Sequence, residues 1–345
     1  LNPDGDPPLT ERGENEGHPR TPISPMSQAA SSTTPSLPVW AESRHPLGWL
    51  IDRLLAVDPV RRLMFLQARQ LIIRTAESRG IAWRDRRQIL QQLAEPLLEA
   101  STHPATTTPG YYRAPFHAYE RGNLCWEAAC EAEQATSAMA LRIWPKEPLT
   151  PQEAETRLRD AIFAILEPSL SGRLERVLDL GCSVGVGTQA LKDWLDRRQE
   201  SDVVVEGLDL SPQMLAVARA RDPEGRISAW HHAAAEATGL PERSFDLVMI
   251  QFVFHELPAD ASRAVLREAR RLLRPGGVLA IADQDPQSEV IRRLPAPLAG
   301  VFRSTEPYLE DYYGLDLEGA LAEAGFHAIR REPCDPRHRV LVAMA

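Results

Sequence analysis

The chain has 345 residues, which is long for one domain and suits one large domain with a smaller one. An apolar fraction of 43% and a charged fraction of 25% are ordinary globular values and exclude wholesale disorder. A formal net charge of -9 disfavours a general nucleic-acid binder, which needs a bulk positive field. No apolar run reaches the ~18–20 residues that span a bilayer, so stable membrane insertion is not expected.

The first 40 residues are rich in Pro, Ser, Thr, Gly and charge and have almost no apolar periodicity. Such a segment buries too little surface to offset its ordering entropy, so residues 1–40 are predicted to be a disordered tail. They also lack the apolar core of a signal peptide. Without an export signal, the four cysteines are expected to be reduced thiols in a cytoplasmic protein. Neither these cysteines nor the histidines show a metal-binding spacing, so no metal is predicted.

Residues 41–149 show a helical apolar pattern and are predicted to form a separate helical domain. The predicted helices cover residues 58–80, 85–100 and 124–143. Pro96 should kink or end the second of them. Its buried side is predicted to carry Ile89, Leu90, Leu93, Leu97 and Leu98.

The stretch from Tyr111 to Trp126 is dense in aromatic side chains for a chain with only 6% of them. Loops of this kind often cover a binding site. An aromatic cluster that docks the helical domain onto the rest of the chain explains the pattern equally well. On the first interpretation, the candidate substrate-binding residues are Tyr111, Tyr112, His117 and Tyr119.

From residue 150 onward, after a helix that ends near Pro168, strand-like and helix-like segments alternate. The predicted strands are 176–180, 203–209, 227–231, 245–251, 278–282, 326–331 and 339–344. The predicted helices between them are 188–196, 212–221, 259–273 and 315–324. Strands separated by helices indicate a mostly parallel sheet with right-handed crossovers. Only a short turn at 334–336 separates the last two strands, which should therefore pair antiparallel.

The first of these strands runs into a glycine-rich turn, VLDLGCSVGVGT over residues 177–188. The glycines permit a tight turn and close approach of the backbone to a ligand. A dinucleotide site would require Gly-x-Gly-x-x-Gly, and the spacing here differs. Asp179, two residues before the first glycine, would repel a phosphate and suits an ammonium group. In an open parallel sheet such a ligand lies beyond the carboxyl ends of the strands.

This segment resembles motif I of the class I S-adenosylmethionine (SAM) methyltransferases. Four further segments resemble motifs of that family, in the family's order. They are VEGLDLS at 205–211, the loop at 235–241, the fourth-strand region at 244–257, and LLRPGGVL at 272–279. The resemblance covers roughly residues 155–345 and is closest to the branch that methylates small molecules, including quinones.

The resemblance implies a Rossmann-like α/β fold, doubly wound, with a seven-stranded sheet whose last two strands form an antiparallel hairpin. It also implies a SAM-binding domain over residues 150–345, covered by the helical domain as a lid or substrate wall. Asp209 would hold the ribose diol, since it lies 24 residues past Gly185. One residue departs from the pattern, because Ala234 stands where many relatives carry an aspartate for the adenine. The implied cofactor-binding residues are Asp179, Gly181, Cys182, Gly185, Gly187, Asp209, Leu210, Met214, Ala235, Glu236 and Gln251.

His255 follows the fourth strand and is the candidate catalytic residue, as a general base. A helix-capping or core histidine is the plainer interpretation. Asp283, Gln284 and Asp285 follow the fifth strand and are predicted to contact the substrate; a solvated loop is the alternative. An oxygen acceptor would require a base such as His255, whereas a nitrogen acceptor needs only positioning.

The predicted function is therefore SAM-dependent methyl transfer to a small-molecule acceptor by in-line displacement, with no nucleic-acid partner. The sequence indicates no oligomeric state. A SAM-binding regulatory protein without turnover is one alternative. A nicotinamide-dependent oxidoreductase is another, and binding of NADH but not of S-adenosylhomocysteine (SAH) would favour it.

Overall fold

The computed structural model describes residues 57–345, except 201, 296–298, 300–301 and 304. The predicted tail at 1–40 and the first residues of the predicted helical domain lie outside the described residues. Among the described residues, no helix combines the length and apolarity that a membrane crossing requires.

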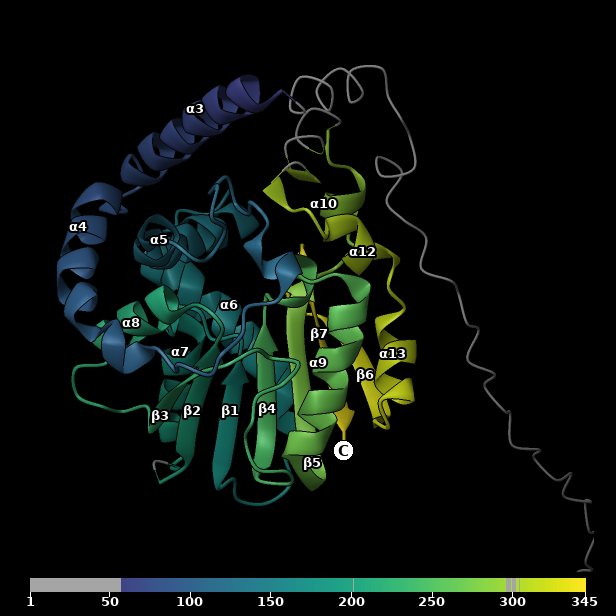
Figure 1. The fold of residues 1–345 in the computed structure, drawn as a ribbon. Helices are drawn as coiled ribbons and strands as arrows, with labels where there is room; N and C mark the ends of the chain where they lie inside the picture. Colours follow the sequence, from purple (N-terminus) through teal and green to yellow (C-terminus); the bar gives the residue numbers. More distant parts are fainter. Residues whose placement is uncertain (1–56, 201, 296–298, 300–301, 304) are drawn as a thin grey trace, which may run out of the picture. The chain divides into compact units, whose positions relative to one another are not determined.

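Four helices precede the sheet in the described chain (Figure 1): α3 (Asp58–Glu77), α4 (Trp83–Ala94), α5 (Trp126–Ile143) and α6 (Pro151–Leu166). Three short 3-10 turns lie between α4 and α5, namely η1 (Glu95–Leu97), η2 (Glu99–Ser101) and η3 (Gly110–Arg113), and a fourth, η4 (Glu167–Ser169), follows α6. α4 ends two residues before Pro96, as predicted, because proline cannot donate the backbone hydrogen bond of a helix interior. α6 begins with a capping box in which the Thr150 and Glu153 side chains accept from each other's backbone N–H.

The buried side of α4 is narrower than predicted. Leu90 is 1% exposed, but Ile89 is 47% and Leu93 53% exposed. The prediction that Ile89 and Leu93 face the core is therefore wrong. α4 packs through a narrow stripe made of Leu90 and, one turn later, Ala94. Side chains about a quarter turn around the helix from this stripe remain exposed to solvent.

The strands of the described chain are β1 (Arg176–Leu180), β2 (Val204–Asp209), β3 (Ala229–His232), β4 (Phe245–Gln251), β5 (Leu273–Gln284), β6 (His327–Pro333) and β7 (His338–Met344). They lie close to all seven predicted strands, although β5 begins earlier because Leu273 already pairs with Phe245. The helices between them are α7 (Val186–Arg197), α8 (Pro212–Arg221), α9 (Ala259–Leu272), α10 (Glu289–Arg292), α12 (Leu309–Gly314) and α13 (Leu317–Glu323), with the 3-10 turn η5 (Phe254–Glu256).

These strands form one seven-stranded sheet in the order β3-β2-β1-β4-β5-β7-β6. β3, β2, β1, β4 and β5 are parallel, and β7 is antiparallel to both β5 and β6. The strand order reverses at β1, which lies between β2 and β4. Ligands of open parallel sheets bind at such a switch point, beyond the carboxyl ends of the strands.

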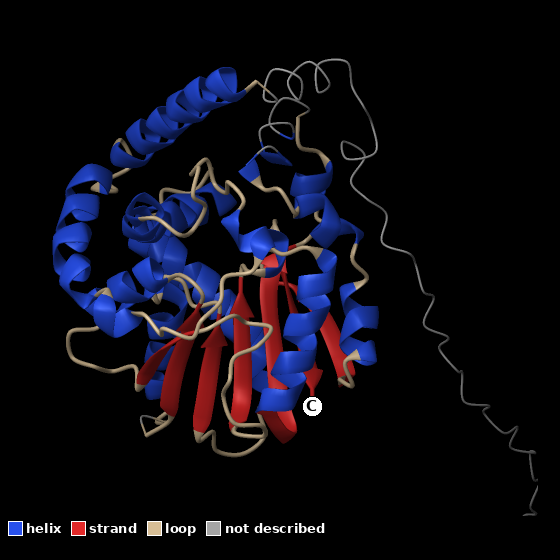
Figure 2. Cartoon of the chain, viewed as in Figure 1, coloured by secondary structure: helices blue, strands red, loops and turns tan. Residues whose placement is uncertain are grey.

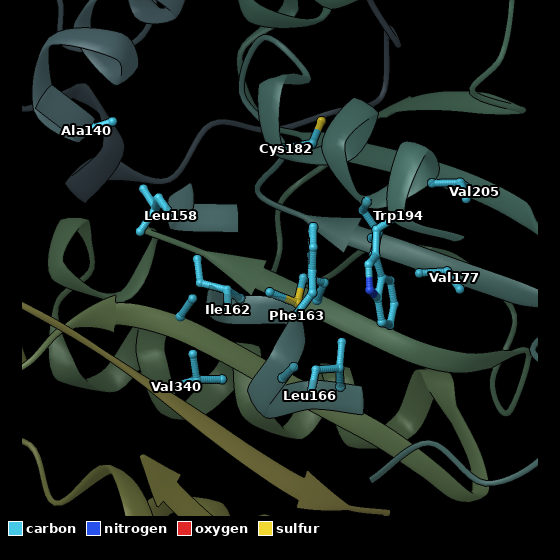
Figure 3. Close-up of a cluster of buried hydrophobic side chains, with 14 of the residues drawn as sticks. Ala140, Leu158, Ile162, Phe163, Leu166, Val177, Cys182, Trp194, Val205 and Val340 are labelled. Atoms are coloured by element: carbon cyan, nitrogen blue, oxygen red, sulfur yellow. The ribbon is translucent and has the colours of Figure 1, made fainter. Parts of the chain in front are cut away.

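Helices cover both faces of the sheet (Figure 2), and successive residues of each strand alternate between the two faces. Val177 belongs to the core beneath α6 and α7, where the Phe163 and Trp194 rings stack with centroids 5.0 Å apart (Figure 3). Leu178 belongs to the opposite core, beneath α9 and α13. Asp179 therefore shares the α6–α7 face with Val177, which brings its carboxylate near those two helices.

Two of the helices that precede the sheet, α4 and α5, share a third core with the glycine-rich turn. Leu90 of α4 and Ala129 of α5 pack with Val184 of the turn and with Met214 and Val217 of α8. α4 and α5 are thus anchored beside the carboxyl end of the sheet, the edge where the predicted site lies (Figure 1).

Candidate functional site

The turn after β1 uses glycine where other residues would be strained or would collide. Gly181 and Gly185 have φ of 83° and 74°, in the left-handed region. A Cβ on Gly185 would lie 2.5 Å from the Trp230 ring, and one on Gly187 would lie 2.6 Å from Gln251 Nε2. The three glycines thus keep the turn tight against β3 and β4.

Asp209 ends β2 beside this turn. Its carboxylate accepts hydrogen bonds from the backbone N–H of Ser183 and of Ser211, each at 2.8 Å. Burial raises the pKa of Asp209 to about 6. Ser211 also caps α8, because its hydroxyl accepts from the Met214 N–H. The acid of the second strand is therefore fixed against the glycine-rich turn of the first.

A buried charged network lies on the α6–α7 face. Asp179 is 1% exposed and accepts from Thr188 Oγ1 at 2.6 Å and from Gln251 Nε2 at 3.4 Å. Arg159 Nη1 donates to Gln251 Oε1 at 2.5 Å. Burial raises the pKa of Asp179 and lowers that of Arg159. Among the described residues, Nε of Arg159 has no hydrogen-bond partner, so this N–H remains available to donate to a ligand.

Arg159 was not among the predicted site residues. The signal for it is a charge on the apolar stripe of α6, where Leu158, Ile162 and Phe163 are all buried. An arginine on such a stripe requires a buried acceptor. Arg159 also lines a cleft of about 440 Å³ between α5, α6 and α7, which neither Asp209 nor His255 lines.

The aromatic segment before α5 crosses the ends of β2 and β3. Tyr111 Oη donates to Glu236 Oε1 at 2.7 Å, and Ser211 Oγ donates to the Asn123 carbonyl at 2.7 Å. Burial and the Asp209 charge raise the pKa of Tyr112. Two of the aromatic substrate candidates thus lie near residues of the predicted cofactor site.

Tyr119 points elsewhere. Its hydroxyl donates to Glu131 on α5 at 2.7 Å, and the Arg69 guanidinium lies 5.4 Å from its ring centre. Tyr119 thus ties the aromatic segment to the helices, which is the docking role that the sequence left open. Tyr111 and Tyr112 lie beside predicted cofactor residues, and their role in covering a binding site stays a prediction.

The remaining cofactor candidates lie at the turn or at the loops after β2 and β3. Met214 accepts from Ser183 Oγ through its sulfur at 3.4 Å. The Leu210 carbonyl accepts from His232 Nε2 at 3.0 Å. Cys182 is buried beside Gly207 of β2, and Ala235 is partly buried in the loop that also carries Glu236.

The candidate catalytic residue, His255, lies in η5 and is 6% exposed. Its Nδ1 donates to Asp283 Oδ1 at 2.8 Å. An ionised carboxylate only accepts, so this contact assigns the Nδ1 proton and leaves Nε2 for other partners. Burial alone would lower the pKa of His255, but the charge and hydrogen bond of Asp283, together with the charges of Glu306 and Glu256, outweigh burial and raise the pKa to about 10.

Asp283 and Gln284 are buried at the end of β5, so neither is in a solvated loop. Asp283 also accepts from the Phe254 N–H at 2.9 Å. Gln284 Oε1 accepts from Tyr313 Oη at 2.5 Å. Asp283 and Gln284, two of the three predicted substrate residues, therefore bind side chains of the protein itself, and Asp283 holds the His255 ring.

Three further side chains lie near His255, namely His117, Glu306 and Glu256. His117, from the aromatic segment, places Nε2 2.9 Å from Glu306 Oε1. Glu256 Oε2 accepts from Asn123 Nδ2 at 2.9 Å, and burial raises the pKa of Glu256 to about 7. Glu306 was not predicted, because nothing around it in the sequence marks it.

A model of the methyltransferase domain matches residues 178–281. The ubiquinone biosynthesis O-methyltransferase of Xanthomonas oryzae pv. oryzae is 30% identical over 213 residues, which cover 53% of this chain and 82% of that enzyme. The chain belongs to the class I SAM-dependent methyltransferases. The 27-O-demethylrifamycin SV methyltransferase of Amycolatopsis mediterranei is 35% identical over 144 residues, or 41% of this chain and 48% of that enzyme.

The chain therefore spans about half the length of some relatives that it matches. Among solved structures, the CurJ carbon methyltransferase is similar with a TM-score of 0.48 and 16% identity, over 79% of this chain and 70% of that one. The family membership favours neither the nicotinamide-dependent oxidoreductase nor the regulatory protein.

Proposed function

We propose that this methyltransferase transfers a methyl group from SAM to a small-molecule acceptor. The observation that carries the proposal is the Asp209 carboxylate held against the glycine-rich turn at the sheet's switch point. The names of two relatives, which concern rifamycin and ubiquinone, support a small organic acceptor. The acidic net charge of -9 supports the same class over a nucleic acid.

The buried groups suit the polar ends of SAM. Asp209 would hold the ribose diol through charge-assisted hydrogen bonds. Asp179 and Arg159, both bonded to Gln251, offer opposite charges to the ammonium and carboxylate of the methionine part. The unfilled Nε of Arg159 fits this assignment, since a carboxylate accepts two donors from one guanidinium. When bound, SAM supplies a methyl group already activated by its sulfonium.

The acceptor side belongs to His255. Asp283 fixes its ring through Nδ1, so Nε2 is the atom left to meet an acceptor. We assign His255 the catalytic role of orienting the acceptor through Nε2 and of taking the acceptor's proton once its own Nε2 proton has left, and Asp283 the role of positioning His255. Tyr111, Tyr112 and His117 would complete the acceptor wall, and their segment would exclude water from it.

The cofactor assignment is tested by isothermal titration of the purified chain with SAH and, separately, with NADH. We expect SAH to bind and NADH not to bind. Turnover is tested with methyl-labelled SAM and a metabolite pool, in which label should appear in a small organic product. Binding of NADH alone would refute the proposal. Tight SAH binding without any labelled product would instead favour the regulatory protein.

A cytoplasmic location is also proposed. All four cysteines are free, and Cys125 and Cys130 are buried, which supports a reducing compartment. Cell fractionation followed by thiol labelling tests this, and recovery of the protein in an oxidised, exported form would contradict it.

A further inference from the structure

Three possible metal ligands converge from distant parts of the chain. His117 comes from the aromatic segment, His255 from η5, and Glu306 from the segment before α12. One donor atom from each lies within 4.8 Å of the other two. Two imidazoles and a carboxylate are the ligand set of many catalytic zinc centres, which keep a further position open.

Each histidine is held in place by its surroundings. Phe116 and Tyr119 exchange backbone hydrogen bonds of 3.1 and 2.8 Å across a two-residue turn. In that turn, His117 and Ala118 have φ of 49° and 66°, a left-handed conformation that few non-glycine residues adopt. The His117 N–H also donates to the Thr305 carbonyl at 2.9 Å, which fixes the turn next to Glu306.

His255 has the support that metal-binding histidines usually have. Its Nδ1 donates to the buried Asp283, which aims Nε2 away from that carboxylate. A carboxylate behind a histidine fixes the ring and makes the second nitrogen a better metal ligand. Asp283 is itself fixed by the backbone N–H of Phe254 and Gln284, at 2.9 and 2.7 Å.

Glu306 supplies the independent indication of a missing ligand. It is 5% exposed, and its Oε2 has no hydrogen-bond partner in the part of the chain that the structure describes. Leaving such an atom buried and unpaired is costly. Asp283 and Glu256 add two more carboxylates close by, so the cluster favours a cation. His117 is 42% exposed, which gives an ion access from solvent.

We propose that His117, His255 and Glu306 bind one divalent transition-metal ion of the Zn²⁺ class. Mg²⁺ is disfavoured because it prefers oxygen ligands and two of these three donors are nitrogens. With the ion bound, His255 Nε2 is a metal ligand and no longer takes the acceptor's proton. An open position on the ion would instead bind an acceptor oxygen and lower the pKa of the attached hydroxyl or enol. This acceptor role, unlike the metal site, rests on the proposed methyltransferase function, and it points to oxygen-bearing acceptors.

The test uses the untagged full chain, stripped with a chelator and dialysed. Zn²⁺ and Mg²⁺ are titrated separately by calorimetry, and bound metal is counted by mass spectrometry. We expect one Zn²⁺ per chain and no Mg²⁺ binding. His117→Ala or Glu306→Gln should weaken Zn²⁺ binding more than tenfold, and Asp283→Asn about 10–100-fold. The control is His327→Ala, which removes an exposed histidine on β6 and should change nothing.

SAH affinity and thermal melting, measured on every variant, show whether each is folded. The proposal fails if wild type binds no Zn²⁺, or binds it no more tightly than a folded His117→Ala, Glu306→Gln double variant. If Zn²⁺ fails to bind while SAH binds, only the metal site is refuted. If one Zn²⁺ binds with the expected loss in the variants but SAH does not bind, the metal site stands and the proposed function falls.

Discussion

The cofactor side and the acceptor side of the site are built in different ways. On the cofactor side, Asp179, the glycine-rich turn and Asp209 come from two consecutive strands and the turns after them. On the acceptor side, His255 and Asp283 meet His117 and Glu306, which lie 189 residues apart (306 − 117) in the sequence. The first arrangement is a local motif, and the second exists only in the folded chain.

This difference decides what the sequence reveals. The glycine spacing predicted the turn, and the structure shows why each glycine is needed there. His255 was predicted from its place after β4, whereas its pairing with Asp283 requires the register between neighbouring strands. No spacing rule connects His117 with Glu306. Metal-binding patterns in sequences rely on ligands that are close along the chain. The prediction of no metal, which was based on such patterns, could not detect this cluster.

The sharpest way to separate the two sides is to remove the His255 imidazole. His255→Ala should lower kcat by roughly 10²–10⁴-fold, because acid–base groups contribute about that much to proton transfer. The SAH dissociation constant should stay within about twofold of wild type, since His255 is assigned to the acceptor and not to SAM. Steady-state kinetics and SAH calorimetry measure the two effects.

His327→Ala serves as the control for this experiment, because that side chain is exposed on β6. It should leave both constants unchanged. An equal loss of SAH affinity and turnover in His255→Ala would show that the two sides are not separable.

The second test concerns the glycine-rich turn. Gly185→Ala should lower the free energy of unfolding by roughly 2–4 kcal/mol, from left-handed strain plus the collision with Trp230. Gly276→Ala is the matched control. Its φ of 78° is nearly the same, but a Cβ there meets nothing within 4 Å, so only about 1–2 kcal/mol of strain should appear. Chemical denaturation measures both, and equal losses would mean that contact with Trp230 contributes nothing.

The fold was more predictable than the packing of its outer helices. Alternating strands and helices placed all seven strands within a few residues, since period and punctuation are local properties. The exposure of Ile89 and Leu93 was missed because apolar periodicity shows which side of a helix is apolar. It does not show how much of that side a neighbouring helix covers. Arg159 was missed because its buried acceptor, Gln251, lies 92 residues away, and a pattern within one helix does not reveal a partner at that distance.

The third test weakens the cofactor side alone. Asp209→Ala should reduce SAH affinity by about 1–3 kcal/mol, because the diol loses its acceptor and buried donors lose their partner. Turnover at saturating SAM should fall less than in His255→Ala. Asp202→Ala is the control, as that side chain is 80% exposed and should change SAH binding by less than about 0.5 kcal/mol. Unchanged SAH affinity in Asp209→Ala would remove Asp209 from the cofactor site.

The smallest effect follows from the protonation of Asp209. Burial raises its pKa to about 6 in the free protein, above the value of about 3.9 in an unfolded chain. Between about pH 4 and 6 the folded state therefore holds a proton that the unfolded state has lost. This contribution to stability is present at low pH and disappears as the pH rises through 6.

SAH binding should respond with the opposite sign, because the ribose diol donates to the ionised carboxylate and so favours loss of that proton. SAH affinity is therefore expected to rise between about pH 5 and 7 by less than about tenfold per pH unit, since one proton is released, and to level off above that range. Calorimetry in buffers of different ionisation enthalpy measures the released proton directly. In Asp209→Ala both the slope and the proton release should vanish, whereas a slope that persists in the variant would assign the titration to another group.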